Sequence, residues 1–133
     1  MNIVVNYEEW EYGCCGKPFK IGDEVEWEGN EPKPEWMESL GRKYDYELFF
    51  HVPNGTKSFK IKGKIAKIEY VYARYEPDEK NVYHAVEYKF GDGQNSDDYE
   101  YSGWSDFGEF RLTSYLITLD VSSIEEFKWK DFK

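Results

Sequence analysis

The sequence predicts an all-β domain: a small SH3-like β-barrel, or a similar barrel formed by a strongly bent sheet, with one or two short helices. Aromatic residues make up 20% of the 133 residues, and they favour pleated, half-buried strands. Several segments alternate between apolar and polar residues, as strands with one buried face do. Turn-forming residues separate these segments. A chain of this length suits one domain, and we expect residues 1–133 to form it.

The first third of the chain is expected to hold two strands and a helix. Residues 3–5 are a short apolar run that fits an edge or closing strand. Residues 19–27 alternate most clearly, with a bend at 22–23. A loop over 29–34 follows. A helix is then expected from Pro34 to the residue before Gly41, because proline suits a first helical turn and glycine ends helices.

The middle of the chain is expected to form a hairpin and then a long bent strand. Residues 53–55, Pro-Asn-Gly, have the chemistry of a turn. Residues 59–75 are the longest β-prone segment. Their bulky residues lie at odd positions up to Ile65 and at even positions from Ile68. We therefore expect a bulge within 63–66, or burial of the strand on both faces.

The last third is expected to contain two strands, a mobile loop and a helix. A turn at 76–81 leads into a strand over 82–90. The polar residues 91–98 are the segment that we expect to be most mobile. A strand over 110–121 follows, and Ser-Ser-Ile-Glu-Glu at 122–126 is a capping-box pattern that predicts a short terminal helix.

The charge balance limits the classes of partner. The chain has 17 Lys+Arg and 27 Asp+Glu, a formal net charge of −10, so duplex nucleic acid and anionic membranes are poor partners. It has no apolar run of the roughly 18 residues that a membrane span needs. Its first ten residues lack the basic start and apolar stretch of a signal peptide. We expect a cytoplasmic protein with no membrane partner.

Two adjacent cysteines, Cys14 and Cys15, are the most distinctive local feature. Neighbours in sequence cannot build the long-range disulfides of a small secreted domain, which agrees with a reducing compartment. A zinc site would need further ligands, and the soft candidates are His51 and His84. We favour thiols packed under the first turn and expect no cofactor. A metal or small-ligand site around Cys14 and Cys15, a redox pair, or a thiolate nucleophile are the alternatives.

Residues 91–110 are the strongest candidate for a partner-binding site. They contain acids and no base, interleaved with aromatic residues, and they do not keep the spacing of an EF-hand calcium loop. Such a loop can meet a basic protein surface, because charge speeds encounter and rings serve as anchors. The favoured function is a non-enzymatic protein-binding module, such as an inhibitor or immunity protein. The candidate contact residues are Asp97, Asp98, Tyr99, Tyr101, Trp104 and Asp106.

A basic strand and the lack of catalytic motifs complete the candidates. The basic residues are Lys57, Lys60, Lys62, Lys64 and Lys67. Lysines interleaved with aromatics can bind single-stranded nucleic acid. We prefer a solvated edge strand on which lysines block pairing between sheets. The chain has no G-x-S-x-G, P-loop or HExxH motif, and we expect it not to be an enzyme.

Residues 10–27 read WEYGCCGKPFKIGDEVEW. This combination of a Trp, a Cys-Cys-Gly, a Pro-Phe and a Gly-Asp-Glu-Val-x-Trp strand resembles the opening of an uncharacterised family of short bacterial proteins, a domain of unknown function. Residues 63–65 and 115–121 look similar to that family as well. Gly-Asp-x-Val also occurs at the first strand of many SH3-like barrels, which supports the fold and not a function. The resemblance implies no activity.

Overall fold

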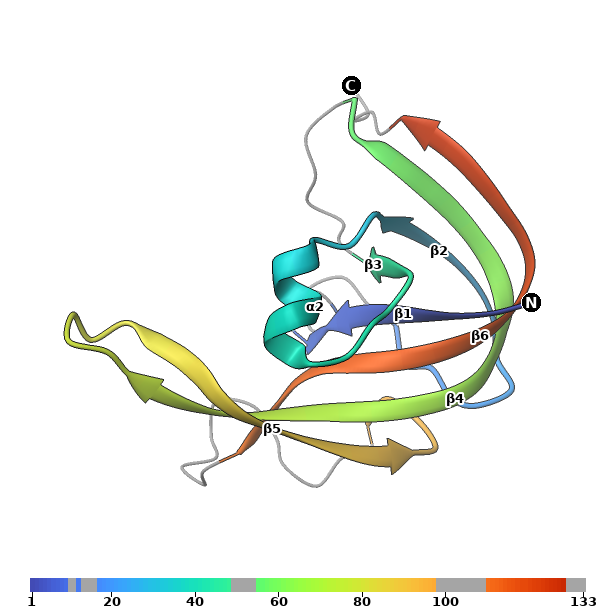
Figure 1. The fold of residues 1–133 in the computed structure, drawn as a ribbon. Coiled ribbons are helices and arrows are strands. Elements are labelled where there is room, and N and C mark those ends of the chain that lie inside the picture. Colours follow the sequence, from blue (N-terminus) through green and yellow to red (C-terminus); the bar gives the residue numbers. More distant parts are fainter. Residues whose placement is uncertain (10–11, 13–16, 49–54, 98–109, 129–133) are drawn as a thin grey trace.

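A computed structural model describes residues 1–9, 12, 17–48, 55–97 and 110–128 (Figure 1). In this part of the chain the elements are β1 (Asn2–Glu8), β2 (Glu24–Asn30), α2 (Pro34–Leu40), β3 (Tyr46–Leu48), β4 (Lys57–Pro77), β5 (Tyr83–Gly93) and β6 (Arg111–Lys128). Strands dominate and the helix is short, so the predicted all-β class with a minor helical part is confirmed. The more specific SH3-like arrangement stays a prediction.

One sheet curves round until its strands form a closed ring. The strand order is β2-β3-β1-β6-β4-β5, and an additional pairing of β2 with β4 closes the ring. β1 and β3 run parallel, whereas the other pairs are antiparallel. Figure 1 shows β4 and β6 bending together around the ring, with α2 lying across its outer side and the β4–β5 hairpin extending beyond it. β5 lies outside the closed ring.

The long strand β4 makes this closure possible because it pairs with three strands. Residues 58–64 pair with β2, residues 68–77 pair with β5, and β6 runs along nearly its whole length. The register with β6 shifts between Lys62 and Gly63 and again between Ile65 and Lys67. Each shift is a bulge that bends the strand and increases its twist. The predicted bulge is confirmed.

The bulges also explain why the bulky residues of β4 change from odd to even positions. Ile65 is buried before the second bulge, and Ile68 and Tyr70 are buried after it. Val71 and Ala73 are buried as well, and Val71 belongs to a cluster on which Met37 and Leu40 of α2 and Tyr88 of β5 pack. Both expected causes of the phase change, a bulge and burial on two faces, are therefore present.

The inner face of the ring forms the main core. Its buried members are Ile3, Val5, Tyr7, Phe19, Leu48, Ile61, Ile65, Ile68, Tyr70, Tyr72, Phe110, Leu112, Tyr115, Ile117 and Leu119. Aromatic rings fill one end, where Phe19 stacks on Tyr7 with centroids 5.9 Å apart and meets Tyr115 edge-on at 5.3 Å. Such pairs add about 0.5–1.5 kcal/mol each beyond the area they bury. Aromatic side chains thus fill much of the interior of the ring.

Helix α2 forms where the sequence predicts it. Pro34 occupies the first turn, and Gly41 ends the helix with a left-handed φ of 74° that suits glycine. Met37 and Leu40 pack on a second cluster of buried residues, Tyr44, Val71 and Leu116. The helix therefore covers the outer face of the sheet and leaves the inside of the ring untouched.

The predicted helix at residues 122–126 is wrong. β6 continues to Lys128, with Ile124 opposite Ile61 and Phe127 opposite Ser58 of β4. A capping box favours a helix by about 1 kcal/mol, whereas the strand gains a continuous backbone ladder and cross-strand side-chain contacts. Tertiary pairing has overridden the local preference.

Two strand boundaries also differ from expectation. β2 begins at Glu24 and continues through Gly29 and Asn30, which were expected to start a loop. Residues 91–93, expected in the mobile loop, extend β5. In both places pairing with β4 prolongs the strand. Of the predicted turn at 53–55, only Gly55 lies within the described residues, and it has a φ of 85°.

Gly63 gives a test of the ring closure. A Cβ at this position would lie 2.8 Å from the Asp120 carbonyl oxygen and 3.2 Å from the Val121 Cα of β6. Because both atoms are backbone, Gly63→Ala should push β4 and β6 apart and lower the free energy of unfolding by about 1–3 kcal/mol. Denaturation in urea, followed by tryptophan fluorescence, measures the loss.

The matched control is Gly91→Ala in β5. Its Cβ would meet only the Tyr72 ring, at 3.6 Å, an ordinary contact distance. We expect a change within about 0.5 kcal/mol. Equal losses for the two variants would contradict a tight approach of β4 and β6 at Gly63.

Candidate functional site

A small cleft lies between α2 and the outer face of the sheet. Its volume is about 190 Å³, below the 300–1,000 Å³ typical of pockets for drug-sized ligands. It can therefore take one long side chain or a small molecule. We call it the α2 cleft, and its lining residues are Asn6, Glu8, Trp36, Ser39, Leu40, Tyr44, Tyr75, Tyr88, Thr113 and Ser114.

Strand alternation and helix periodicity place these residues. In β1, Val5 and Tyr7 point into the core, so Asn6 and Glu8 point to the outer face. In α2, Trp36 and Leu40 are four residues apart and therefore share a helix face. The sheet thus supplies the polar floor of the cleft, and the helix supplies one apolar wall.

A buried acid, Glu47 of β3, lies beside the floor. It is opposite Asn6 in the parallel β1–β3 pairing and is only 2% exposed. The Asn6 amide nitrogen donates to both carboxyl oxygens of Glu47, at 2.9 and 3.2 Å. Burial raises the pKa of Glu47 to about 8, although hydrogen bonds from Tyr44 and Asn6 oppose the rise and the negative charge of Glu8 adds to it. Glu47 is therefore mostly protonated at neutral pH.

Tyr44 completes this polar group. Its side chain is 5% exposed, and burial raises its pKa, with further contributions from the hydrogen bond to Glu47 and from the charges of Glu47 and Glu8. Its hydroxyl therefore stays protonated and acts as a hydrogen-bond donor to Glu47. Both groups are mainly protonated at neutral pH, and the negative charge of Glu8, which raises the pKa of Glu47, lies at the cleft.

Asn6 also carries an unused acceptor. Its amide nitrogen is occupied by Glu47, but its Oδ1 is buried without a hydrogen-bond partner among the described residues. An unsatisfied buried polar atom costs about 1–3 kcal/mol, and native structures hold few of them. Because Asn6 lines the α2 cleft, a ligand that donates a hydrogen bond there would remove this cost.

Aromatic rings make up much of the remaining wall, from Trp36, Tyr44, Tyr75 and Tyr88. Ring faces attract cations, and the chain itself uses this contact nearby: the Arg111 guanidinium lies 4.6 Å from the Tyr75 ring centre. A carboxylate, an unused acceptor and several rings are the groups that a protonated amine or a guanidinium needs. The α2 cleft is therefore suited to a cation.

The sequence had pointed instead to residues 97–106, of which the structure describes Asp97 alone. Asp97 is exposed, and its carboxylate accepts a hydrogen bond of 2.9 Å from the Tyr12 hydroxyl. It does not line the α2 cleft. Asp98, Tyr99, Tyr101, Trp104 and Asp106 lie outside the described residues, as do Cys14, Cys15 and His51.

The described part of the expected mobile loop makes several hydrogen bonds to the core. Ser96 is fully buried, and its Oγ accepts a hydrogen bond of 3.0 Å from the Phe19 backbone N–H. The Tyr115 hydroxyl donates to the Ser96 carbonyl at 2.8 Å, and the Tyr70 hydroxyl donates to the Asn95 carbonyl at 2.6 Å. The tyrosines of the core thus anchor Asn95 and Ser96 at the end of the ring, and the mobility expected of this stretch stays a prediction.

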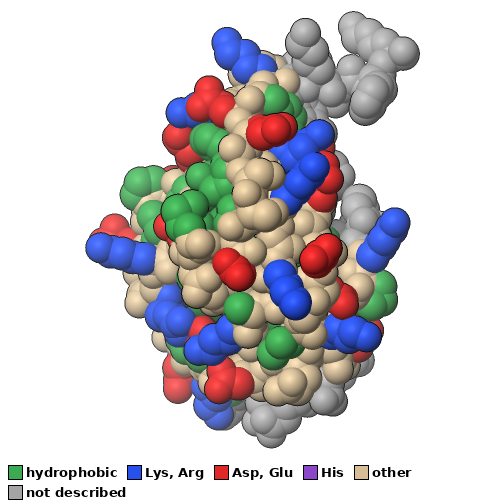
Figure 2. All heavy atoms as spheres, turned by 90° about the vertical axis from the view of Figure 1, so that its right-hand side faces the viewer, with side chains coloured by type: hydrophobic (Ala, Val, Ile, Leu, Met, Phe, Trp, Pro, Cys, Tyr) green, Lys and Arg blue, Asp and Glu red, His purple; other side chains and the backbone are tan. Residues whose placement is uncertain are grey.

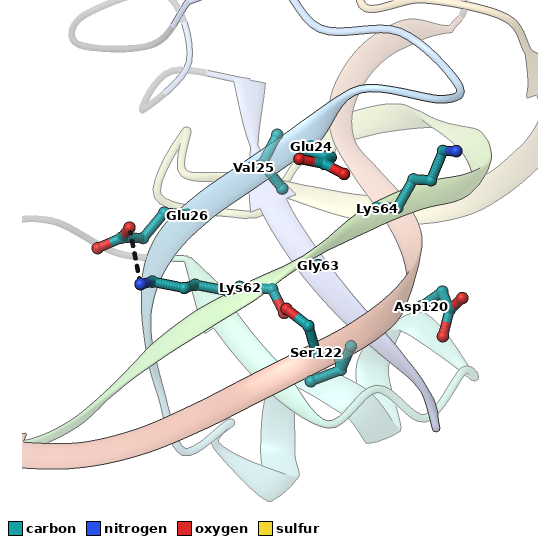
Figure 3. A pocket seen from close by; sticks show the side chains of 9 residues that line it. Glu24, Val25, Glu26, Lys62, Gly63, Lys64, Asp120 and Ser122 are labelled. Carbon is teal, nitrogen blue, oxygen red and sulfur yellow. Dashed lines mark hydrogen bonds and ion pairs between the residues drawn. The ribbon is translucent and has the colours of Figure 1, made fainter.

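The interpretation of the lysines as edge protection is also wrong. β4 is an inner strand here, with β2 on one side and β6 on the other. Figure 3 shows the Lys62 ammonium reaching Glu26, at 3.7 Å, and Lys64 between Glu24 and Asp120, its neighbours in register. Acidic and basic side chains alternate over this face in Figure 2.

These ion pairs weaken the case for nucleic-acid binding. Lys60 also pairs with Glu26, at 3.6 Å, and Lys57 pairs with Glu31 at 3.2 Å. The groove of about 540 Å³ drawn in Figure 3 contains three acids and two lysines in its lining. A phosphate backbone would meet carboxylates on both sides of Lys64 and on one side of Lys62.

The α2 cleft had little signal in the sequence. Glu8 belongs to an acidic aromatic run, but nothing near Asn6 or Glu47 marks them as partners 41 residues apart. Their contact depends on a parallel pairing of two short strands, which periodicity does not reveal. Within the described residues, no three His, Cys, Asp or Glu side chains form a metal site, and no helix is long and apolar enough to cross a membrane.

Glu47 makes stability depend on pH. Because its pKa is raised from 4.5 to about 8 by folding, its contribution to stability is complete below the lower value and is lost as pH rises through the upper one. The Glu47→Gln variant has no ionisable side chain at this position. Relative to Glu47→Gln, the native chain should lose on the order of 4 kcal/mol of unfolding free energy between pH 4.5 and 9. Urea denaturation at several pH values measures this difference, and a constant difference would contradict a buried neutral Glu47.

Comparisons with known proteins place the chain in a family without an assigned activity. No curated protein matches it, and no solved structure matches it. A family model described as "Family of unknown function (DUF6578)" matches residues 1–121. This agrees with the resemblance of residues 10–27 to a domain of unknown function. The chain belongs to this family of unknown function, DUF6578.

Proposed function

We propose that the chain is a non-enzymatic binding module that recognises a basic partner protein and takes one of its arginine or lysine side chains into the α2 cleft. The observation that carries this proposal is the cleft itself, where the Glu8 carboxylate, the unused Asn6 Oδ1 and several aromatic rings surround a space of about 190 Å³. An inhibitor or immunity protein acting on a basic protein would be a module of this kind.

The charge of the whole molecule supports a basic partner. A net charge of −10 accelerates the approach of cationic surfaces and slows that of anionic ones. The cleft then supplies specificity, because a guanidinium can stack on a ring while donating to oxygen atoms at its edge. The acidic and aromatic residues Asp97, Asp98, Tyr99, Tyr101, Trp104 and Asp106 remain candidate contacts for the same partner.

The chemistry of the cleft favours binding over catalysis. Its described lining contains no His or Cys, the residues that most often supply a base or a nucleophile near neutral pH. Burial keeps the Tyr44 hydroxyl neutral. The adjacent Cys14 and Cys15 agree with a reducing compartment such as the cytoplasm.

A pair of matched probes tests the cleft. N-acetyl-argininamide carries a guanidinium, and N-acetyl-citrullinamide has nearly the same shape without the charge. In an NMR titration of the ¹⁵N-labelled chain, the charged probe should shift the indole N–H of Trp36 and the neutral probe should not. Glu8→Gln should weaken this binding about three- to tenfold, because it removes the negative charge at the cleft.

Glu38→Gln is the control. Glu38 lies on α2, is exposed and does not line the cleft, so it removes the same charge from nearby. We expect it to leave the affinity within about twofold, since an exposed charge contributes little. Equal shifts from both probes, or equal losses in the Glu8 and Glu38 variants, would contradict the proposal.

Binding of the charged probe should also depend on pH. A cation beside Glu47 favours its ionised form and lowers its pKa from about 8. The affinity should therefore rise as pH increases from 6.5 to 8.5 and then level off. The total rise should be about tenfold for each unit by which the bound cation lowers the pKa of Glu47. The guanidinium stays charged throughout this range. In Glu47→Gln the affinity should not change with pH, and an unchanged slope in this variant would exclude Glu47 as its source.

A further inference from the structure

The outer edge of β5 offers backbone groups for a further strand. β5 is the last strand in the sheet order, and among the described residues it pairs with β4 alone. It spans 11 residues at the hairpin that extends beyond the ring (Figure 1). A long strand edge of this kind is a template for pairing with another chain unless the protein protects it.

Exposed apolar side chains gather on the same hairpin. The members with the largest exposure are Val82 at 51%, Tyr83 at 64%, Val86 at 46% and Phe90 at 37%. Single exposed apolar residues are common on protein surfaces, but several on one strand and its turn are typical of an interaction site. The edge therefore offers both hydrogen-bonding groups and apolar contacts.

The sequence of β5 indicates which chain fits this edge. When two copies of β5 are aligned antiparallel with Tyr88 opposite Tyr88, Glu87 lies opposite Lys89 of the other copy, and Lys89 lies opposite Glu87. In the same alignment Val86 lies opposite Phe90. Opposite charges and apolar pairs directly across a strand pair are stabilising. We propose that a second copy of this chain pairs here, forming a two-fold symmetric dimer through β5.

Charge disfavours the two neighbouring symmetric registers, and the remaining ones lack the Glu87–Lys89 pairs. Centring the pair on Glu87 places the two Glu87 carboxylates opposite each other, and centring it on Lys89 does the same for the two ammonium groups. Like charges directly opposite are destabilising. Only the register centred on Tyr88 pairs both charges favourably, and this complementarity selects a second copy over an unrelated strand.

Contacts within one chain allow this pairing. Glu87 accepts a hydrogen bond from Arg74 at 3.3 Å, and Lys89 lies 4.3 Å from the Phe110 ring centre. The Arg74–Glu87 pair is exposed and contributes little. Lys89 is itself exposed, although the Phe110 ring is buried, so its ammonium group can also contact another partner. A bulge opposite Arg74 and Tyr75 interrupts β5 at Val86 and twists the strand there. The strongest pairing is therefore expected over Glu87, Tyr88 and Lys89.

Charge reversal gives a sharp test in the full chain. Sedimentation equilibrium at about 0.15 M salt, where repulsion between the two acidic molecules is largely screened, should show a dimer of the native chain. Lys89→Glu places two Glu pairs across the interface and should raise the dimer dissociation constant at least tenfold. Glu87→Lys should do the same through two Lys pairs. Circular dichroism checks that both variants remain folded.

Mixing the two single variants distinguishes charge repulsion across the interface from a general loss of structure. When Lys89→Glu is mixed with Glu87→Lys, every facing pair becomes attractive again, so the two variants should associate with each other although each alone is monomeric. The double variant Glu87→Lys/Lys89→Glu should likewise recover the native dissociation constant within about threefold. A native chain that stays monomeric up to 0.2 mM overturns the proposal, and so do single variants that do not associate when mixed.

Discussion

The backbone ladder along β4 is the constraint on which the rest of the molecule depends. β2, β6 and β5 all pair with this strand, so its shape determines theirs. The bulges beside Gly63 and Lys67 bend it, and the bend lets β2 return to β4 and close the ring. The close approach at Gly63 admits no side chain. The closed ring then holds the aromatic side chains on its inner face, where they form the core.

The α2 cleft follows from the outer face of the same sheet. Ring closure brings β3 beside β1, and this parallel pairing presses Glu47 against Asn6. Burial makes the acid neutral, which is the less costly state away from water. The amide that satisfies Glu47 leaves its own oxygen at the cleft. The hydrogen bond that Asn6 donates to Glu47 therefore leaves the Asn6 Oδ1 as an acceptor for a ligand, and Glu8 adds the charge.

Local patterns predicted the parts of this fold that local chemistry decides. Pro34 and Gly41 marked α2 correctly, and the change of phase between Ile65 and Ile68 located a bulge. The patterns failed where distant strands decide: residues 122–126 carry a helix signal but complete the ladder of β6 with β4. The contact of Asn6 with Glu47 had no local sign for the same reason. Composition alone marked residues 91–110 as a candidate site, whereas the α2 cleft depends on how distant strands pair.

The pairing of β1 with β6 has a consequence for how the chain reaches this structure. Residues 2–8 find their antiparallel partners at 114–120, so the ring cannot close until almost the whole chain is available. Closing such long loops costs entropy before contacts compensate for it, and topologies of this kind fold in milliseconds to seconds. During synthesis at about 5–20 residues per second, β1 must wait several seconds for β6. Its apolar residues lack their β6 partners during that time, so the synthesis of β6 sets the earliest point at which the ring can close.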